Sequence, residues 1–129
     1  MSGSLLDTSV LIARDDGGAL ALPESAAISV ITLGELRAGV LVATNEAVAE
    51  DRRGRLAAVR FAFAPLPVDE TVSECYGEVL ATARSQRRAA KATDLLIIAT
   101  AAAADRALFT LDTSQARLAE QAGVAATIL

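Results

Sequence analysis

Short apolar segments recur along the chain and alternate with longer segments in which apolar residues have helical spacing. The short segments are three to five residues long and apolar on both sides, as strands covered on two faces are. They are built from Leu, Ile, Val, Phe and Ala, with almost no charge inside them. We predict five strands, at residues 4–6, 26–30, 66–68, 107–111 and 125–129.

The longer segments place apolar residues three and four positions apart, as one face of a helix does. Leu33, Leu36 and Val40 form such a stripe. The segment that begins at Asp94 is apolar nearly all round, which predicts a deeply buried helix. We predict helices at residues 32–43, 46–63, 70–85, 94–104 and 114–122.

The alternation of strands and helices predicts an α/β fold with three layers, in which a short parallel sheet is flanked by helices on both faces. No linker, repeat or low-complexity tract divides the 129 residues, so we expect a single domain over residues 1–129. Ligands of such sheets bind beyond the carboxyl ends of the strands. The residues that follow the strands are therefore the first candidates for a functional site.

Four acidic residues stand where the predicted elements begin or end: Asp7, Glu35, Asp94 and Asp112. They lie far apart in the sequence and can meet only through the fold. A carboxylate cluster without His or Cys suits hard cations such as Mg²⁺ or Mn²⁺. Such ions activate water and bind the oxygens of a phosphodiester during in-line displacement. The four residues together therefore predict a metal-dependent phosphodiesterase site.

Each of the four also has a purely structural explanation. Asp7 can cap a short helix that follows it. Residues 32–35 (Thr-Leu-Gly-Glu) match the capping box, with Thr32 as the cap and Glu35 at the third helical position after it, N3. Asp94 can cap the apolar helix, and Asp112 can be the turn residue before the last one. For Glu35 the pattern alone favours the cap. The coincidence of all four at element starts is what favours a site.

Several polar neighbours extend this candidate site. The hydroxyls of Thr8 and Ser9 can orient a carboxylate or a water molecule from the second shell of a metal, and Ser9 can also cap a helix. Basic residues that could contact phosphate are Arg37, Arg87, Arg88 and Lys91. A solvated helix face explains all four equally well, and we favour it for the two adjacent arginines.

The composition narrows the chemistry further. Twelve basic and 16 acidic residues give a formal net charge of −4, whereas nucleic-acid-binding domains usually carry a basic excess. Carboxylates that hold a cation add to the same negative count, so the acidity does not exclude a nuclease. The chain has no His, which excludes His-based acid–base catalysis and a Cys-His nucleophile pair. Cys75 is its single cysteine, which fits a reducing compartment, and we expect a cytoplasmic protein.

The chain also lacks the signals of targeting and membrane insertion. Residues 1–6 carry no basic stretch, and Asp7 follows them directly, so we expect no signal peptide. The apolar run at residues 95–104 is shorter than the roughly 20 residues that a membrane-spanning helix needs. We therefore expect no membrane association.

Four segments resemble the motifs of a known family. Residues 6–12 (LDTSVLI) resemble the opening motif of PIN-domain nucleases, and residues 31–39 (ITLGELRAG) are similar to the second motif of VapC-type toxins. Residues 92–101 (ATDLLIIATA) resemble the third motif, and residues 108–112 (LFTLD) the fourth. The first motif alone is weak, but the four in this order and spacing are specific and cover essentially the whole chain.

The resemblance implies a PIN fold with an acidic pocket that binds Mg²⁺ or Mn²⁺ through Asp7, Glu35, Asp94 and Asp112. It implies an endoribonuclease that acts as the toxin of a type II toxin–antitoxin pair and cleaves tRNA or rRNA with a metal-activated water. The implied partners are RNA, a VapB-like antitoxin and a second copy of the chain in a homodimer. Such toxins often carry a further acid shortly after the fourth motif, whereas here none follows Asp112 before Glu120.

Other functions are open at this point. A haloacid-dehalogenase-like hydrolase also places an Asp after its first strand, but it needs a second Asp at the position of Ser9. A receiver domain needs an acidic pair before its phosphoacceptor and a late Lys, and both are missing. The remaining alternative is a catalytically weak PIN-like module that only dimerises or binds protein. Such a module has no need to gather four carboxylates in one pocket.

Overall fold

The computed structural model describes residues 3–14 and 25–129 as an α/β fold. Its strands are β1 (Ser4–Leu6), β2 (Ala26–Ser29), β3 (Pro65–Leu66), β4 (Ala107–Thr110) and β5 (Ala126–Ile128). Its helices are α1 (Thr8–Arg14), α2 (Val30–Leu41), α3 (Glu46–Ala62), α4 (Glu70–Ser85), α5 (Ala92–Ala103) and α6 (Thr113–Gln121). None of the helices in these residues is long and apolar enough to cross a membrane.

The strands form one parallel sheet in the order β3-β2-β1-β4-β5. The first strand of the chain is therefore the central strand, and Leu5 pairs with Ala27 on one side and with Leu108 on the other. From β1 the chain builds the sheet outward to β3, and then returns to build the other side from β4. The strand order thus reverses between β1 and β4, and parallel sheets bind ligands at the carboxyl ends of such a pair.

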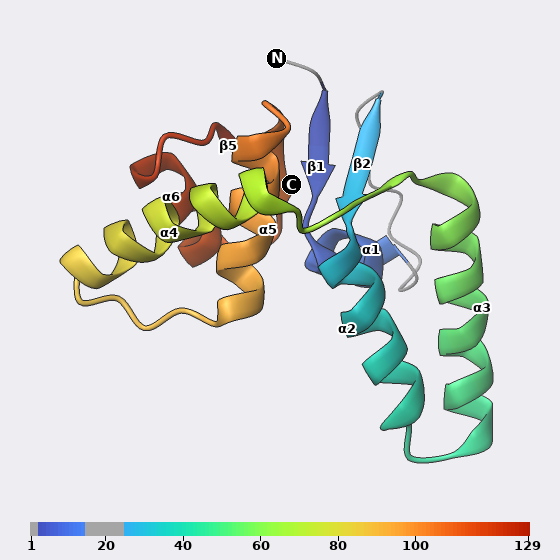
Figure 1. The fold of residues 1–129 in the computed structure, drawn as a ribbon. Coiled ribbons are helices and arrows are strands. Elements are labelled where there is room, and N and C mark those ends of the chain that lie inside the picture. Colours follow the sequence, from blue (N-terminus) through green and yellow to red (C-terminus); the bar gives the residue numbers. More distant parts are fainter. Residues whose placement is uncertain (1–2, 15–24) are drawn as a thin grey trace.

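Helices cover both faces of the sheet, which gives the predicted three layers (Figure 1). Successive strand residues point to opposite faces. Leu5 and Leu108 belong to a core that packs against α4, α5 and α6, whereas Leu6 and Ile28 belong to a second core that packs against α1, α2 and α3. Helix α5 is buried along most of its length, as its apolar sequence predicts.

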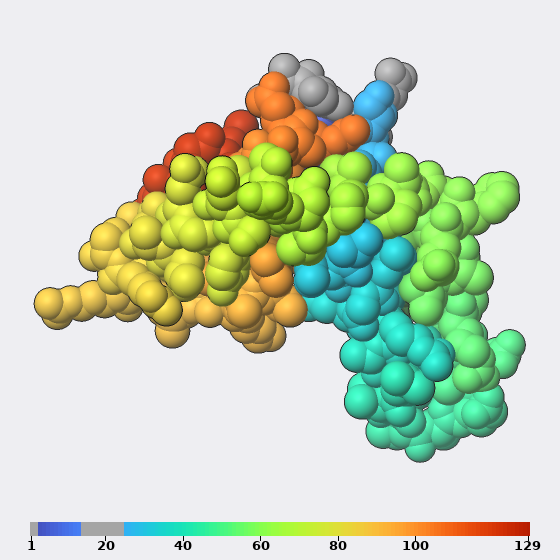
Figure 2. Space-filling model, viewed as in Figure 1, coloured from blue at the N-terminus to red at the C-terminus, as the bar shows by residue number. Residues whose placement is uncertain are grey.

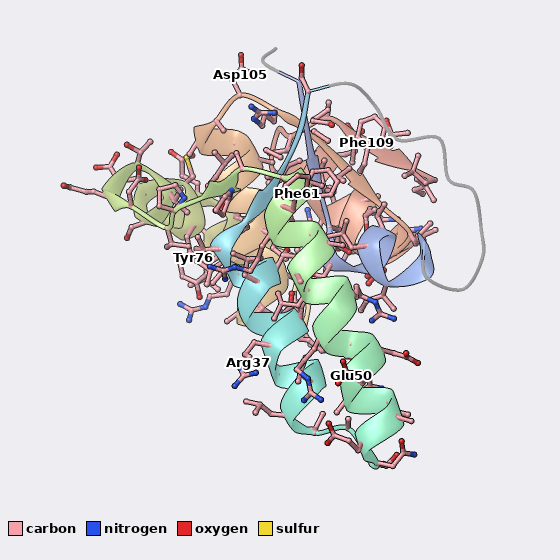
Figure 3. All side chains as sticks on the ribbon, turned by 90° about the vertical axis from the view of Figure 1, so that its right-hand side faces the viewer. Arg37, Glu50, Phe61, Tyr76, Asp105 and Phe109 are labelled. Carbon is pink, nitrogen blue, oxygen red and sulfur yellow. The ribbon has the colours of Figure 1, made fainter. Side chains whose placement is uncertain are left out.

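Helices α2 and α3 form an antiparallel pair that extends away from the sheet (Figures 1 and 2). Asn45 caps α3 by accepting a hydrogen bond from the backbone N–H of Val48 at 2.9 Å. Arg53 forms ion pairs with Glu46 and Glu50 on the same helix. Arg37 is exposed on α2, on the side away from α3 (Figure 3), so the structure gives it the solvated position that its pattern allows.

The structure confirms the predicted elements and corrects several of their ends. The strand at residues 4–6 and the helix at residues 70–85 have the predicted bounds. The second strand ends at Ser29, because Val30 already belongs to α2. The third strand covers Pro65–Leu66 and not residues 66–68; it lies at the edge of the sheet, where proline is tolerated because no ladder bond needs its missing N–H.

Candidate active site

Asp7 lies at the carboxyl end of β1, where the strand order reverses. Its backbone N–H donates to the carbonyl of Phe109 on β4 at 2.9 Å, which fixes its position between the two strands. Its Oδ2 accepts hydrogen bonds from the hydroxyl of Ser9 at 2.6 Å and from its backbone N–H at 3.3 Å. Thr110 at the end of β4 places its hydroxyl 3.1 Å from the same oxygen. Asp7 is only 5% exposed, and these three contacts orient its carboxylate.

Ser9 ties the two strand ends together. Besides donating to Asp7, its hydroxyl accepts a hydrogen bond from the backbone N–H of Leu111 at 3.1 Å. The short helix predicted after Asp7 is present as α1, and the backbone N–H of Ser9 in its first turn donates a hydrogen bond to the Asp7 carboxylate. Asp7 thus caps this helix, as predicted. Asp7 and Ser9 can therefore serve both the helix cap and the candidate site. Ser9 has the contacts of a residue that orients a carboxylate.

Glu35 reaches the same region from α2, and the predicted capping box is wrong. Helix α2 begins at Val30, and its cap is Ser29, whose hydroxyl accepts from the backbone N–H of Ile31 at 3.0 Å. Glu35 therefore lies in the second turn, and its Oε1 accepts a hydrogen bond from the hydroxyl of Thr8 at 2.7 Å. Thr32, which the pattern placed at the cap, is buried and lies 2.9 Å from Thr8.

Asp94 lies in the first turn of α5 without capping it. The cap position is Lys91, and its side chain makes no capping hydrogen bond. Burial raises the pKa of Asp94, and the charges of Asp7, Glu35 and Asp112 raise it further, while Lys91 opposes them. The other three carboxylates that the sequence singled out therefore lie near enough to Asp94 to disfavour its charge.

Asp112 has the structural role that its sequence position allows. It caps α6, with Oδ1 accepting from the backbone N–H groups of Ser114 at 2.9 Å and Gln115 at 3.2 Å. Its own N–H donates to the hydroxyl of Thr110 at 3.0 Å. These hydrogen bonds orient the Asp112 carboxylate, which is exposed to solvent. Asp112 therefore both caps α6 and lies at the edge of the acidic site.

The donor chemistry fits a hard divalent cation, because four carboxylates share the site with no His or Cys. Their repulsion is what a bound cation would relieve. However, in residues 3–14 and 25–129 no three acidic or other ligating side chains stand close enough together to hold an ion. Charge acts over longer distances than a metal–ligand bond, which reconciles the two observations. Binding of one ion by three of them would require their side chains to turn toward one another.

A pocket adjoins the carboxylates, and it contains residues that the sequence placed elsewhere. Arg88 and Lys91 line it together with Asp94 and Asp112, so for Arg88 the solvated helix face is wrong. Gln115 also lines it, and nothing in its sequence pattern pointed to a site, because a neutral amide leaves no charge signature. Its one signal is the position, shortly after the fourth motif, where similar toxins often carry an acid.

The fold and these side chains define a class of protein: a parallel α/β sheet with an acidic site at the carboxyl ends of the two strands where the strand order reverses. The model of the PIN domain family matches residues 4–121. The chain belongs to the PIN-domain family.

The comparisons also confirm the resemblance to VapC proteins. The chain is 48% identical over 100 residues to Ribonuclease VapC8 of Mycobacterium tuberculosis, covering 75% of this chain and 88% of the relative. It is 32% identical over 126 residues to Ribonuclease VapC5 of the same organism, covering 95% and 93%.

Solved structures show the same similarity. The crystal structure of VapBC-5, a toxin–antitoxin system of M. tuberculosis, matches with a TM-score of 0.86 and 31% identity and covers both chains completely. FitAcB from Neisseria gonorrhoeae matches with a TM-score of 0.74 and 30% identity, covering 95% of this chain and 94% of the other.

Proposed function

We propose that the chain is a metal-dependent endoribonuclease and the toxin of a type II toxin–antitoxin pair, with tRNA or rRNA as its substrate. The observation that carries this proposal is the convergence of Asp7, Glu35 and Asp112 on Asp94, whose pKa is raised by burial and then by their charges. The names of the curated relatives, which are ribonucleases, support the activity. The structural neighbours that are toxin–antitoxin complexes support the biological role.

The residues that would hold Mg²⁺ or Mn²⁺ are Asp7, Asp94 and Asp112, with Glu35 as a further ligand or as the group that orients the attacking water. A bound divalent ion would activate water and neutralise charge on the scissile phosphate. The carboxylates contribute the negative charge that selects the ion, and none of them is needed as a nucleophile. Cleavage would leave a 5′-phosphate and a 3′-hydroxyl.

Thr8 and Ser9 act through the carboxylates that they contact. The hydroxyl of Thr8 holds Glu35 at 2.7 Å, and that of Ser9 holds Asp7 at 2.6 Å. Each hydroxyl donates its proton to a carboxylate oxygen. Each therefore restricts the orientations in which that carboxylate can bind a metal ion. Outer-shell partners of this kind commonly contribute 10–100-fold to metal affinity or activity.

The proposal extends to partners and setting. A VapB-like antitoxin would inhibit the enzyme, and two copies of the chain would form a homodimer that acts in the cytoplasm. The 129 residues would act as a single domain. The alternative is a catalytically weak dimerisation or protein-binding module, which is favoured by the lack of a ready three-ligand cluster in the described part of the chain.

The deciding experiment is incubation of purified, antitoxin-free protein with total bacterial RNA in Mg²⁺, in Mn²⁺ and in chelator. We expect cutting at a few discrete sites with either metal and none in chelator. Sequencing of the RNA ends would identify the target and test the 5′-phosphate. Absence of cutting with every metal, from protein shown to be folded by circular dichroism, would favour the binding module.

Replacement of Ser9 by alanine tests the orienting role of its hydroxyl. In Ser9→Ala the Asp7 carboxylate loses its shortest contact, and the N–H of Leu111 loses its acceptor. We expect about tenfold weaker Mn²⁺ binding by calorimetry, a similar loss in cleavage rate, and roughly 1–2 kcal/mol less unfolding free energy. Ser73→Ala on the exposed side of α4 is the matched control. Unchanged metal affinity in Ser9→Ala would contradict the role.

A further inference from the structure

A pocket of about 200 Å³ adjoins the four carboxylates and has no assigned occupant. It lies between the loop that follows α4, the start of α5 and the first turns of α6. The side chains that matter here are Arg88, Lys91, Asp94, Asp112, Ser114 and Gln115. Asp94 and Asp112 also belong to the candidate active site. A ligand bound in the pocket would therefore lie directly beside that site.

Gln115 leaves a donor without a partner in this pocket. The residue is 5% exposed, and its Oε1 lies 3.1 Å from the hydroxyl oxygen of Thr110, which also lies 3.1 Å from Asp7 Oδ2. Its Nε2 is buried and has no hydrogen-bond partner in the described part of the chain. A buried donor left unpaired is unfavourable by roughly 1–3 kcal/mol, so this N–H favours an acceptor placed in the pocket.

Two cations line the same pocket and are available to a ligand. Neither Arg88 nor Lys91 forms an ion pair with a carboxylate of residues 3–14 or 25–129. Arg88 is instead held by neutral groups, since its Nη1 donates to Gln121 Oε1 at 3.1 Å and its Nη2 to Ser114 Oγ at 3.4 Å. A guanidinium fixed by neutral partners keeps its charge for an anion.

The start of α5 adds further donors. Lys91 occupies the cap position of this 12-residue helix, and its side chain makes no hydrogen bond to the first backbone N–H groups. The N-terminus of a helix favours a negatively charged group. The pocket thus combines a guanidinium, an ammonium, an amide N–H and a helix start, which together form a donor set for an anion with several acceptor oxygens.

We infer that this pocket binds a phosphate group of the RNA chain next to the scissile phosphodiester, with Arg88, Lys91 and Gln115 as its donors. The inference rests on the proposed ribonuclease function and specifies where that substrate is held. A phosphate group carries several oxygen acceptors and a negative charge, which suit this set of donors. Asp94 and Asp112 oppose an anion, so we expect binding to be tighter when a divalent cation offsets their charge.

The test uses adenosine 5′-monophosphate, which contains no phosphodiester to cleave. The ¹⁵N-labelled protein is titrated with this probe and with adenosine, both in Mg²⁺, by NMR. The chain has four side-chain amides, at Asn45, Gln86, Gln115 and Gln121, so the Gln115 signal is assigned by its loss in Gln115→Leu. We expect the nucleotide, and not adenosine, to shift this signal.

The affinity for the nucleotide gives a second measurement. Arg88→Ala should weaken it about tenfold, as expected for one hydrogen bond to a charged group, while Arg87→Ala on the adjacent exposed position should change it less than twofold. Because Gln115 is buried, its variant serves only for assignment, and the test of affinity uses the partly exposed Arg88. The Gln115 signal in the wild-type protein reports on the amide directly.

The outcomes separate the subsite from the ribonuclease function. The subsite is overturned, even if RNA is cut, when the nucleotide does not shift the Gln115 signal. This result is expected if the Gln115 amide is turned so that its Nε2 contacts Thr110. Equal nucleotide affinity in Arg88→Ala and Arg87→Ala would also overturn it. A shifted signal with weakened affinity in Arg88→Ala supports the phosphate subsite even if total RNA stays intact, in which case only the nuclease proposal fails. Shifts of equal size with adenosine would show that the base is bound and overturn the assignment to phosphate.

Discussion

Asp7→Asn is expected to reduce RNA cleavage by about a thousandfold or more while the protein remains folded. The change keeps the size of the side chain and an oxygen that can accept from Ser9 and Thr110, but it removes one negative charge from the site. Two unit charges 4 Å apart interact by about 4 kcal/mol at an effective dielectric constant of 20, which corresponds to roughly a thousandfold in rate. The measurement is the initial rate of cleavage of the identified RNA at saturating Mn²⁺.

Asp51→Asn is the matched control for this variant. Asp51 is exposed on α3, so the same chemical change there should leave the rate within twofold of the unmodified protein. A thermal melt of Asp7→Asn in chelator should show no loss of stability, because removal of the Asp7 charge relieves its repulsion of Asp94. Retention of full activity by Asp7→Asn would remove this residue from the site.

Asp94→Asn is expected to stabilise the metal-free protein at neutral pH. The folded protein raises the pKa of Asp94, through burial first and then through its acidic neighbours. The folded state therefore binds this proton more tightly than the unfolded state, and the unfolding free energy falls as the pH rises from the unfolded pKa, about 3.9, through the folded one. Asparagine cannot ionise, so the variant should melt above the unmodified protein at pH 7 in chelator, and the difference should vanish near pH 4.

Divalent metal should reverse this order of stability. At about 100 times its dissociation constant, a ligand that binds only the folded state adds about 2.7 kcal/mol, or roughly 8–12 °C in Tm for a chain of this size. We expect Mn²⁺ to raise the Tm of the unmodified protein by that amount and that of Asp94→Asn by much less. The measurement is calorimetric melting at pH 4 and pH 7, each with and without metal. A variant that melts lower than the unmodified protein in chelator at pH 7 would show that the Asp94 charge is stabilising.

Much of the fold could be predicted from the sequence, because alternating apolar segments determine which elements form. The start of α2 could not. Val30 and Ile31 are β-branched and continue the apolar run of β2, so the pattern extended the strand to Val30 and placed the helix cap at Thr32. In the fold Ser29 caps the helix, and Thr32 is buried against Thr8. Ser29 and Thr32 are equally suitable helix caps by their local sequence, and tertiary packing selects Ser29.

The sequence could predict that the four carboxylates lie near one another, but it could not predict the contacts that hold them. Strand ends located Asp7 and Asp112, since chemistry in parallel sheets concentrates there. The hydrogen bonds of Thr110 with Asp7 and of Thr8 with Glu35 join segments that no local pattern relates. The only sequence signal for Gln115 was its position shortly after the fourth motif, because its unpaired Nε2 becomes visible only in the folded structure.

The central position of β1 in the sheet has a consequence for folding during translation. β1 is made first, but its partner β4 lies about 100 residues later, and closure of so long a loop makes folding slow. Asp7 obtains its contacts with Phe109 and Thr110 only when that late strand has left the ribosome. A nascent chain therefore has no assembled acidic site until β4 has been synthesised, near the end of its translation.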